Sequence, residues 1–492
     1  MTDSVRFLLG DRIETVAAPD PTTTVLQWLR RNGRIGTKEG CAEGDCGACT
    51  VVLGEPSDGT VRYRAVNACI LFLPMLDGRQ LLTVEDLEGP GGVLHPVQQA
   101  MIDAHASQCG FCTPGFAMSL FALFHDGVAG GAASGPADEE AIQDALAGNL
   151  CRCTGYRPIL DAARRVAGGG TDRFTAHAGD AAACLAAIGR DRGLSYRAPD
   201  GRSWHAPRSL AELARLAAAH PDAWPDAWLV AGATDVGLWV TKQHRRADTL
   251  IWLGEVGELR GVTERDGWLE IGAAATYRQA FPAIAARWPG FGALLGRLGS
   301  TQIRNSGTIG GNVANASPIG DSMPALIALG ARVVLNAGGA ARELALEDFF
   351  LGYRKTALAA GEILERVRVP LAEPTHFATY KVSKRRDQDI SAVAAGFALR
   401  LDGGIVAEAR LAFGGMAAVP ARAPHAERAL VGQPWTADAA RAAMAALDRD
   451  FQPLSDMRAS AGYRMLVARN LLMRFLLETT GRGESLEALA HA

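Results

Sequence analysis

The N-terminal third of this chain is defined by its cysteines, because eight of the nine lie within the first 153 of 492 residues. Cysteines gathered in this way form disulfides in oxidising compartments and hold metal in reducing ones. The first residues place charges among short apolar pieces, unlike a signal peptide, so we expect a cytoplasmic protein with metal-bound thiolates. The ninth cysteine, Cys184, stands alone in an Ala-rich stretch and is expected to be a bystander thiol.

The first cysteine set has the spacing of a plant-type ferredoxin. It begins as C-x4-C-x2-C and ends with a fourth cysteine after 19 further residues: Cys41, Cys46, Cys49 and Cys69. Glycines at 40, 44 and 47 lie among these ligands, where they permit positive φ and let backbone N–H groups approach sulfur. Structural zinc sites usually repeat C-x2-C pairs, so the spacing favours a [2Fe–2S] cluster over zinc.

The second cysteine set consists of two short motifs, QCGFCTPG and NLCRCTGYRPI, whose cysteines are Cys109, Cys112, Cys151 and Cys153. Thr113 and Pro114 suit the first turn of a helix, and a helix N-terminus would stabilise the negative charge of a thiolate-bound cluster. The C-x-C pair is tight for an ordinary zinc knuckle, but on spacing alone zinc and iron–sulfur remain comparable interpretations of this set.

In their order along the chain, EGCAEGDCGACT, QCGFCTPG and CRCTGYRPI resemble the two iron–sulfur domains of the xanthine oxidase family of molybdenum hydroxylases. The resemblance covers most of residues 40–160. It implies a ferredoxin-like [2Fe–2S] domain followed by a four-helix domain with a second [2Fe–2S] cluster, with all eight ligand positions intact. It also implies that Gln108 and Cys153 lie against the pterin of a molybdenum cofactor, although Gln108 could instead be a simple polar residue at a helix start.

Two Gly-rich stretches in the second half could bind a nucleotide. LVAGATDVGLWV at 229–240 is an apolar strand that runs into a small-residue turn, whose exposed N–H groups could cradle a pyrophosphate. TIGGNVANASPIGDSMPAL at 308–326 combines glycines with hydrogen-bonding side chains. Each alone could equally be a tight turn between strands. The sequence contains neither G-x-G-x-x-G nor G-x-x-x-x-G-K-[ST], so a Rossmann site and a P-loop are not supported.

Together these stretches resemble the FAD domain of the same family over about residues 205–490, a fold shared with vanillyl-alcohol oxidase and p-cresol methylhydroxylase. GYRKT, EIL and YKVSKRRDQDIS at 352–356, 362–364 and 380–391 fit the family as well. The resemblance implies that one segment wraps the FAD diphosphate: Leu229, Val230, Ala231, Gly232, Ala233, Thr234, Asp235 and Val236. It implies that a second set surrounds the nucleotide and flavin: Leu298, Thr308, Gly311, Asn312, Asn315, Asp321, Leu364 and Lys381.

Two positions depart from the family pattern. Leu298 stands where the family often has an aromatic residue that packs near the isoalloxazine. Gln388 stands where an acidic residue is expected, and this departure bears on how the loop would recognise NAD.

The hydrophobic patterning and the resemblance together predict an α+β multidomain chain. We expect a β-grasp ferredoxin-like domain over 1–87, a helical [2Fe–2S] domain over 88–167, a linker over 168–200, an FAD-binding domain over 201–372 and a C-terminal α+β subdomain over 373–492. Local patterns predict a hairpin over 4–16, a Gly/Ala-rich connector at 127–137, a helix over 210–219 and a single strand over 262–271.

Two one-electron carriers and a flavin would suit the conversion of single electrons into NADH. No set of residues for activating a substrate is evident, so no catalytic side chain is expected here. The resemblance implies the electron-transfer subunit of a xanthine dehydrogenase, in a heterotetramer of two small and two molybdopterin-binding large chains that oxidises hypoxanthine and xanthine with NAD as acceptor. The order of iron–sulfur and FAD segments within one chain favours this over an aldehyde, carbon monoxide or N-heterocycle dehydrogenase.

A rival of another class is a non-enzymatic scaffold stabilised by zinc at both cysteine sets. The formal net charge of −3 gives no reason to expect nucleic acid or an anionic membrane as a partner. No apolar run approaches the roughly 18 residues of a spanning helix, so no membrane insertion is expected.

Overall fold

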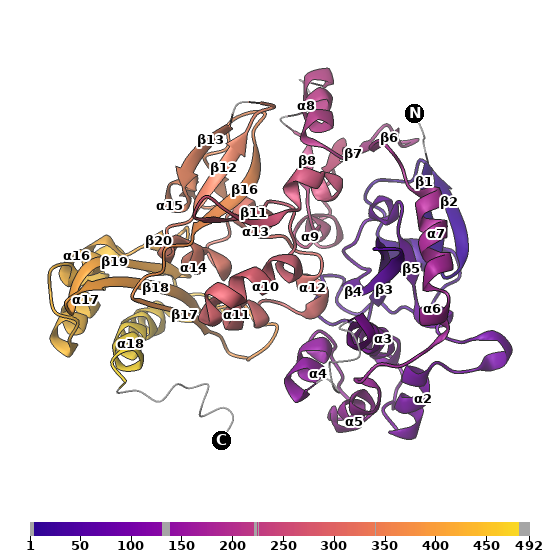
Figure 1. The fold of residues 1–492 in the computed structure, drawn as a ribbon, viewed down its shortest axis with the longest axis horizontal. Helices are drawn as coiled ribbons and strands as arrows, with labels where there is room; N and C mark the ends of the chain where they lie inside the picture. Colours follow the sequence, from indigo (N-terminus) through magenta and orange to yellow (C-terminus); the bar gives the residue numbers. More distant parts are fainter. Residues whose placement is uncertain (1–3, 130–137, 221–223, 225, 340, 482–492) are drawn as a thin grey trace. The chain divides into compact units, whose positions relative to one another are not determined.

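The computed structural model describes residues 4–129, 138–220, 224, 226–339 and 341–481 (Figure 1). The chain divides into two compact units, of which unit 1 comprises Met1–Gly257 with the short segment Gly299–Gly307, and unit 2 comprises Glu258–Leu298 with Thr308–Ala492. The segment 299–307, named the return segment below, therefore packs with unit 1 although unit 2 flanks it on both sides.

Unit 1 begins with a five-stranded sheet in the order β2-β1-β5-β3-β4, in which β1 and β5 are parallel and the other pairs antiparallel. Its strands are β1 (Ser4–Leu9), β2 (Arg12–Ala17), β3 (Thr50–Ser57), β4 (Thr60–Asn67) and β5 (Gln80–Leu82). Helix α1 (Val25–Arg31) buries Val25, Leu26 and Leu29, the apolar stripe of its sequence, and Thr24 caps its first turn.

Strand β3 is buried on both faces. Alternate residues belong to two different hydrophobic cores, with Val51 and Leu53 packed in the core that contains α1 and Val52 in the core that contains α3 (Thr113–Ala129). Three further helices complete the helical domain: α2 (Pro96–Asp103), α4 (Glu139–Leu146) and α5 (Arg157–Val166). Because α3 continues to Ala129, it extends into the connector expected at 127–137, of which residues 130–137 lie outside the described residues.

The segment 168–200, expected to be a linker, is largely structured. It forms helices α6 (Arg173–Ala176) and α7 (Ala178–Ile188) and strand β6 (Leu194–Arg197). Helix α7 buries Leu185 and Ile188 against the core of the helical domain, while Cys184 on the same helix is exposed. The Gly- and Ala-rich composition concealed this docking, because two apolar contacts on one short helix leave a weak periodic signal.

The rest of unit 1 contains a four-stranded sheet in the order β6-β7-β9-β8. Its further elements are β7 (Ser203–Ala206), α8 (Leu210–Ala219), β8 (Trp228–Val230), α9 (Val236–Thr241) and β9 (Thr249–Trp252), with α12 (Thr301–Arg304) supplied by the return segment. The predicted helix over 210–219 is confirmed.

Unit 2 contains a five-stranded sheet in the order β10-β11-β16-β12-β13. The strands are β10 (Val262–Arg265), β11 (Trp268–Gly272), β12 (Arg332–Asn336), β13 (Ala341–Ala345) and β16 (Ile363–Pro370), accompanied by α10 (Tyr277–Arg287), α11 (Pro289–Gly296), α13 (Ile309–Asn315), α14 (Ser322–Ala328), α15 (Leu346–Phe349) and the hairpin strands β14 (Phe350–Gly352) and β15 (Lys355–Thr356). The single strand expected over 262–271 is wrong. Asp266 and Gly267 both have positive φ, at 49° and 78°, and form the two-residue turn of a hairpin.

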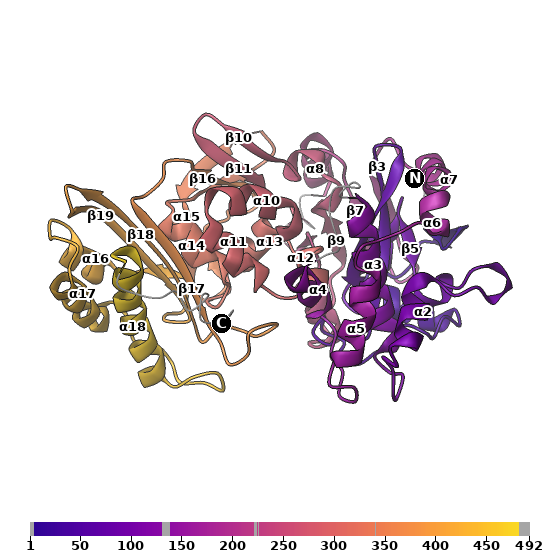
Figure 2. The same cartoon turned by 60° about the horizontal axis from the view of Figure 1, so that its bottom comes forward.

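A second sheet of unit 2, in the order β17-β18-β19-β20, has helices on both faces (Figure 2). Its elements are β17 (His376–Val382), β18 (Val393–Asp402), β19 (Ile405–Gly414), β20 (Ala421–Arg422), α16 (Pro424–Leu430), α17 (Ala437–Asp450) and α18 (Ala461–Thr479). Helix α14 lies on the face opposite these three helices, so close that a Cβ on Gly396 would lie 2.5 Å from the carbonyl oxygen of Pro324.

Within the part of the chain that the structure describes, no helix combines the length and the apolar character needed to cross a lipid bilayer.

Candidate cluster and flavin sites

The loop between α1 and β3 folds around the sulfur of Cys41. This sulfur accepts backbone N–H groups from Glu43, Asp45 and Cys46 at 3.3–3.4 Å, and the N–H of Cys41 in turn points at the sulfur of Cys46 at 3.3 Å. Backbone donors aimed at sulfur stabilise negative charge on a thiolate. The backbone of this loop is therefore arranged to stabilise a thiolate at Cys41.

The glycines of this loop have two different tasks. Gly44 and Gly47 have φ of +80° and +66°, as their predicted role requires. Gly40 permits a close approach instead, since a Cβ there would lie 2.8 Å from the sulfur of Cys46. Ala42 also has a positive φ, 56°, which shows how tightly the loop is wound.

The other half of the first cysteine set is buried. Cys49 lies immediately before β3 and Cys69 follows β4, and each is only 2% exposed. Contacts with the sulfurs of Cys46 and Cys69 lower the pKa of the Cys41 thiol, whereas contacts with Cys41 and Cys49 raise the pKa of Cys69. Contacts between Cys41 and Cys46, Cys41 and Cys69, and Cys49 and Cys69 bring the four sulfurs together, as the predicted ligand set requires.

The second cysteine set lies between the start of α3 and the start of α5. Cys151 is buried and its sulfur accepts the backbone N–H groups of Cys153 and Thr154 at 3.4 Å. Burial, followed by contact with Cys151, raises the pKa of the Cys112 thiol to about 12. Cys109 and Cys153 contact one another but are exposed. The structure thus brings together all four cysteines of this set as well.

Both sites fit the chemistry of a [2Fe–2S] cluster. Each offers four cysteine sulfurs and backbone N–H groups directed at sulfur. The first site adds glycines where a Cβ would obstruct the loop.

Residues far apart in sequence join the two cysteine loops. Gln302 of the return segment is fully buried, and its amide nitrogen lies 3.1–3.2 Å from Thr50 Oγ1, Ser119 Oγ and Asn149 Oδ1. These partners belong to the ferredoxin-type sheet and to the helical domain. Sequence reasoning missed this junction, because Gln302 belongs to no motif.

Asn149 continues the junction on the side of the first cysteine loop. Its side-chain amide donates to the carbonyl oxygen of Gly47 at 3.0 Å, and the N–H of Leu150 donates to the carbonyl oxygen of Cys46 at 3.0 Å. The two loops are therefore held together one residue away from Cys151.

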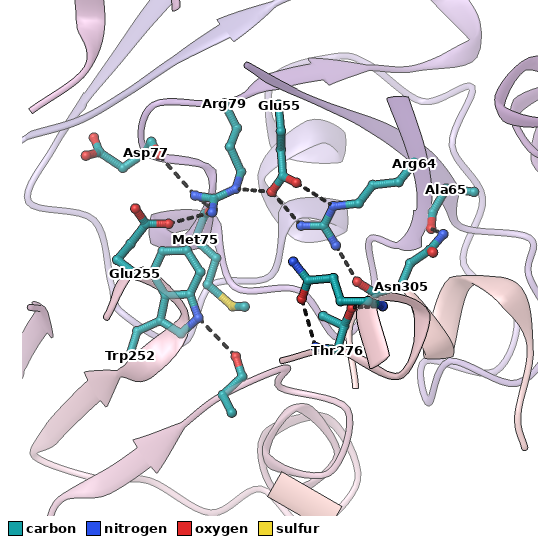
Figure 3. A network of polar contacts seen from close by, with 12 residues as sticks. Glu55, Arg64, Ala65, Met75, Asp77, Arg79, Trp252, Glu255, Thr276 and Asn305 are labelled. Carbon is teal, nitrogen blue, oxygen red and sulfur yellow. Dashed lines mark hydrogen bonds and ion pairs between the residues drawn. The ribbon is translucent and has the colours of Figure 1, made fainter. Parts of the chain in front are cut away.

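The return segment has a second attachment, through Asn305, to a partly buried ionic network (Figure 3). Glu55 accepts hydrogen bonds from Arg64 and Arg79 at 2.8–3.2 Å, Arg64 also donates to the backbone oxygen of Asn305, and Arg79 reaches Glu255 at 2.5 Å. Burial opposes ionisation of Glu55, but the charges of Arg64 and Arg79 outweigh it and hold the pKa of this carboxyl well below its ordinary range.

The predicted diphosphate-wrapping segment 229–236 lies in unit 1, where β8 leads through a turn into α9. The turn packs closely against the return segment, since a Cβ on Gly232 would fall 1.9 Å from the carbonyl oxygen of Ser306. The Trp252 indole donates to the backbone oxygen of Ala231 at 3.0 Å. Ala233 has a φ of +60°. The strand and the turn are as predicted, the helix α9 that follows was not part of the prediction, and contact with a diphosphate stays a prediction.

The other predicted flavin residues lie in unit 2, several with local structural tasks. Thr308 caps α13 by accepting the N–H of Gly311 at 2.9 Å, and Asn312 accepts the hydroxyl of Ser322 at 2.9 Å. Asn315 is the last residue of α13. A Cβ on Gly310 would lie 2.4 Å from the Cα of Ala273, so this glycine is required for packing within the protein.

Lys381 and Asp321 form a buried ion pair, with Nζ 2.5 Å from Oδ2 and the Lys381 side chain 2% exposed. Lys381 also donates to Ser391 Oγ at 3.1 Å and to the backbone oxygen of Asp389 at 2.9 Å. Ser391 closes the network by donating to Asp321 Oδ1 at 2.6 Å. Sequence reasoning selected the lysine and the aspartate but not the serine that connects them.

Two of the remaining predicted positions are apolar and the third lies in a loop. Leu364 on β16 is buried in the core of unit 2, and Leu298 packs partly buried against the same core. Gln388 has a positive φ of 48°, and its backbone oxygen accepts from Arg385 at 3.0 Å. Their predicted contacts with flavin and NAD stay predictions.

A buried group of two histidines and an aspartate lies apart from the cysteine loops. Asp172 Oδ2 lies 2.7 Å from His95 Nε2 and 3.0 Å from His125 Nε2. Burial opposes ionisation of Asp172, but hydrogen bonds from His125 and His95 dominate and hold its pKa well below the ordinary value. His95 Nδ1 already accepts the N–H of Val97, so its Nε2 carries the proton and cannot ligate a metal. The group is a hydrogen-bonded clasp that anchors the start of α6.

Four family models match the chain in the order of its domains. They are the 2Fe-2S iron-sulfur cluster binding domain over residues 9–73, the [2Fe-2S] binding domain over 83–164, the FAD binding domain in molybdopterin dehydrogenase over 196–372 and the CO dehydrogenase flavoprotein C-terminal domain over 378–479. These matches confirm the predicted fold class, the two [2Fe–2S] clusters and the FAD, and they decide the open choice at the second cysteine set in favour of iron–sulfur.

Similar proteins include xanthine dehydrogenase of Emericella nidulans, 33% identical over 96% of this chain and 38% of that protein, and xanthine dehydrogenase 1 of Arabidopsis thaliana, 34% identical over 87% and 36%. Aldehyde oxidase 2 of Cavia porcellus is 32% identical over 88% and 36%. The chain spans little more than a third of these proteins' length.

Among solved structures, a chain of the Cu,Mo-CO dehydrogenase is 30% identical with a TM-score of 0.52, and 57% of this chain covers 98% of it. Quinoline 2-oxidoreductase from Pseudomonas putida 86 has a chain that is 28% identical with a TM-score of 0.52, covering 57% of this chain and 97% of its own. The chain belongs to the xanthine dehydrogenase family of molybdenum hydroxylases, of which it carries the two [2Fe–2S] domains and the FAD domain.

Proposed function

We propose that this chain is the electron-transfer subunit of a cytoplasmic xanthine dehydrogenase. It would receive electrons from the molybdenum centre of a partner chain that oxidises hypoxanthine and xanthine, and deliver them to NAD. The observation that carries the proposal is the presence of both iron–sulfur domains and the FAD domain in one chain, matched over 96% of its length by a xanthine dehydrogenase.

Two sets of four cysteines are the ligands in this proposal: Cys41, Cys46, Cys49 and Cys69 for one cluster, and Cys109, Cys112, Cys151 and Cys153 for the other. Their support is the convergence of the sulfurs and the N–H groups aimed at them. When bound, the clusters supply one-electron transfer and FAD supplies the conversion between single electrons and a hydride. The protein's own task is to bind these groups and to stabilise the negative charge that each gains when it is reduced.

The second proposed FAD-binding set, the residues around Asp321 and Lys381, lies within unit 2. The buried ion pair of Lys381 and Asp321 supports the second set, since charged groups are rarely buried without a specific role or partner.

The partner is proposed to be a molybdopterin-binding large chain, with two copies of each chain in the complex. The exposed edge of the second cysteine set supports such a partner. Cys153 is exposed there, and the large apolar side chains of Phe111 and Leu150 nearby in sequence are also exposed. Gln108 and Cys153 would then face the pterin.

A second candidate function is that of another member of the family, such as an aldehyde or carbon monoxide dehydrogenase. The 32% identity to an aldehyde oxidase, close to that of the xanthine dehydrogenases, favours keeping this candidate. Substrate choice would reside on the partner chain, so a substrate screen of the co-purified complex with NAD distinguishes the two candidates.

The function of the chain itself is tested with the purified subunit under anaerobic conditions, with NADH and xanthine added in separate cuvettes. We expect NADH to bleach the flavin and cluster absorbance and xanthine to leave it unchanged. Bleaching by xanthine alone would contradict the division between two chains. Absence of bleaching by NADH, with FAD present, would point to an acceptor other than NAD. The glutamine at position 388, where an acidic residue is expected, would then be the first candidate for the loss of NAD recognition.

A further inference from the structure

Thr154, within the motif CRCTGY, contacts a proposed cluster ligand through its side chain. Its Oγ1 lies 3.1 Å from the sulfur of Cys151, and the backbone N–H of Tyr156 donates to the same Oγ1 at 3.1 Å. A metal-bound thiolate carries no proton, so the Thr154 hydroxyl must be the donor to sulfur. The N–H of Tyr156 occupies a lone pair of Oγ1 and leaves the hydroxyl hydrogen available for this bond.

The local fold holds Thr154 in this position. Gly155, between the two residues, has a positive φ of 64°, which lets the chain turn so that the N–H of Tyr156 points back at Thr154. The phenolic oxygen of Tyr156 accepts the N–H of Cys151 at 2.9 Å. Thr154 thus contacts the sulfur of Cys151, and Tyr156 accepts a hydrogen bond from its backbone N–H. Cys151 is 5% exposed, so little water competes for its sulfur.

The first cysteine set has a counterpart in Asn67. This residue is buried at the end of β4, in register with Thr50 on β3, and its amide nitrogen lies 3.8 Å from the sulfur of Cys49. An amide oxygen cannot face a thiolate favourably, because both groups only accept hydrogen bonds. The nitrogen therefore faces the sulfur when a cluster is bound.

We propose that Thr154 and Asn67 are positioning residues that raise the reduction potential of one cluster each, acting through the sulfurs of Cys151 and Cys49. Reduction adds one negative charge to a cluster, and a donor directed at a ligand sulfur stabilises the more negative form. Burial strengthens this effect because the local dielectric is low. The inference rests on the cluster ligands proposed above, and it gives each cluster its own side-chain control of potential.

The test is a redox titration of the purified holoprotein followed by electron paramagnetic resonance, with the two [2Fe–2S] signals assigned by the loss of one of them in Cys49→Ser. Thr154→Val removes the hydroxyl and keeps the shape. We expect it to shift the one-electron equilibrium of the helical-domain cluster roughly tenfold toward the oxidised form, about 59 mV. Thr154→Ser restores the hydroxyl and should restore the potential.

Asn67→Leu provides the reciprocal measurement. It should lower the potential of the ferredoxin-domain cluster and leave that of the helical-domain cluster unchanged. Unchanged potentials in Thr154→Val and Asn67→Leu, with both signals present, would overturn the inference and leave the ligand assignment intact. A shift of both clusters in either variant would overturn it too, because it would indicate a general structural change.

Thr154→Ala serves as the second variant if Thr154→Val loses iron. Loss of the helical-domain cluster from both, with Thr154→Ser intact, would overturn the control of potential in favour of a structural role. A Cys49→Ser protein that keeps both signals would instead contradict the proposed ligands, so the two failures are distinguishable.

Discussion

Lys381 and Asp321 show at the scale of single residues how a buried charge depends on its partner. The pair is closed by Ser391, so each charged atom has a hydrogen-bonding partner of its own. Removing one member of such a pair costs more than the pair itself contributes, because the remaining charge stays buried without its counterion.

We predict that Lys381→Met destabilises unit 2 by about 3–5 kcal/mol, since Asp321 would remain buried and unpaired. We also expect lower FAD content, measured as flavin released by acid per chain. Lys384→Met is the matched control, because Lys384 lies in the same stretch but is exposed, and surface changes usually stay within about 0.5 kcal/mol. Equal thermal stability and equal flavin content in the two variants would contradict the proposed role of the pair.

At the scale of elements, the first cysteine loop and the β3–β4 hairpin both contain glycines with positive φ, yet in different surroundings. Gly59 in the hairpin has a φ of +77° and open space where a Cβ would stand. Gly47 has a φ of +66°, and a Cβ there would lie 2.2 Å from the carbonyl oxygen of Gly148. An alanine at Gly59 would therefore introduce backbone strain alone, whereas an alanine at Gly47 would introduce both strain and a steric collision.

We predict that Gly59→Ala costs about 1–2 kcal/mol, from left-handed backbone strain alone. Gly47→Ala should cost about 1–3 kcal/mol more, because overpacking is added, and it should displace the loop that carries Cys46 and Cys49. Iron and labile sulfide per chain, measured beside thermal unfolding, check this. If Gly47→Ala retains iron and stability as well as Gly59→Ala does, the two iron–sulfur domains do not approach each other as closely at Gly47 as described above.

The elements also show which local patterns sufficed for prediction. The helix with the stripe Val25, Leu26 and Leu29 was predictable, because three buried residues at helical spacing leave a clear period. The strand expected over 262–271 was not correct, since Asp266-Gly267 is a hairpin turn signal inside an apolar alternation. Helices α6 and α7 were not expected, because their docking depends on the Asp172 clasp and a few apolar contacts rather than on strong periodicity.

At the scale of the whole molecule, the proposed cluster ligands of the two sets belong to separate domains, and the FAD domain follows them in the chain. We predict that Cys49→Ser lowers the iron content from about four to about two per chain, since each [2Fe–2S] cluster holds two iron atoms. FAD should remain bound. Cys184→Ser is the matched control and should keep all the iron, because Cys184 is exposed on α7 and belongs to neither cysteine set. Loss of flavin from a folded Cys49→Ser protein would contradict this separation.

By itself, the sequence determined which cysteines form the two sets and identified the first set as a [2Fe–2S] site by its spacing. Part of each ligand set is local, because Cys41, Cys46 and Cys49 are a few residues apart with glycines between them, and this spacing is visible in the sequence whatever the rest of the chain does. Only the tertiary structure decided which distant side chains meet: Gln302 reaches Asn149 across 153 positions of the chain, and Lys381 reaches Asp321 across 60. Such contacts follow from how buried surfaces pack, and packing between distant segments leaves no period or motif in the sequence that could reveal it.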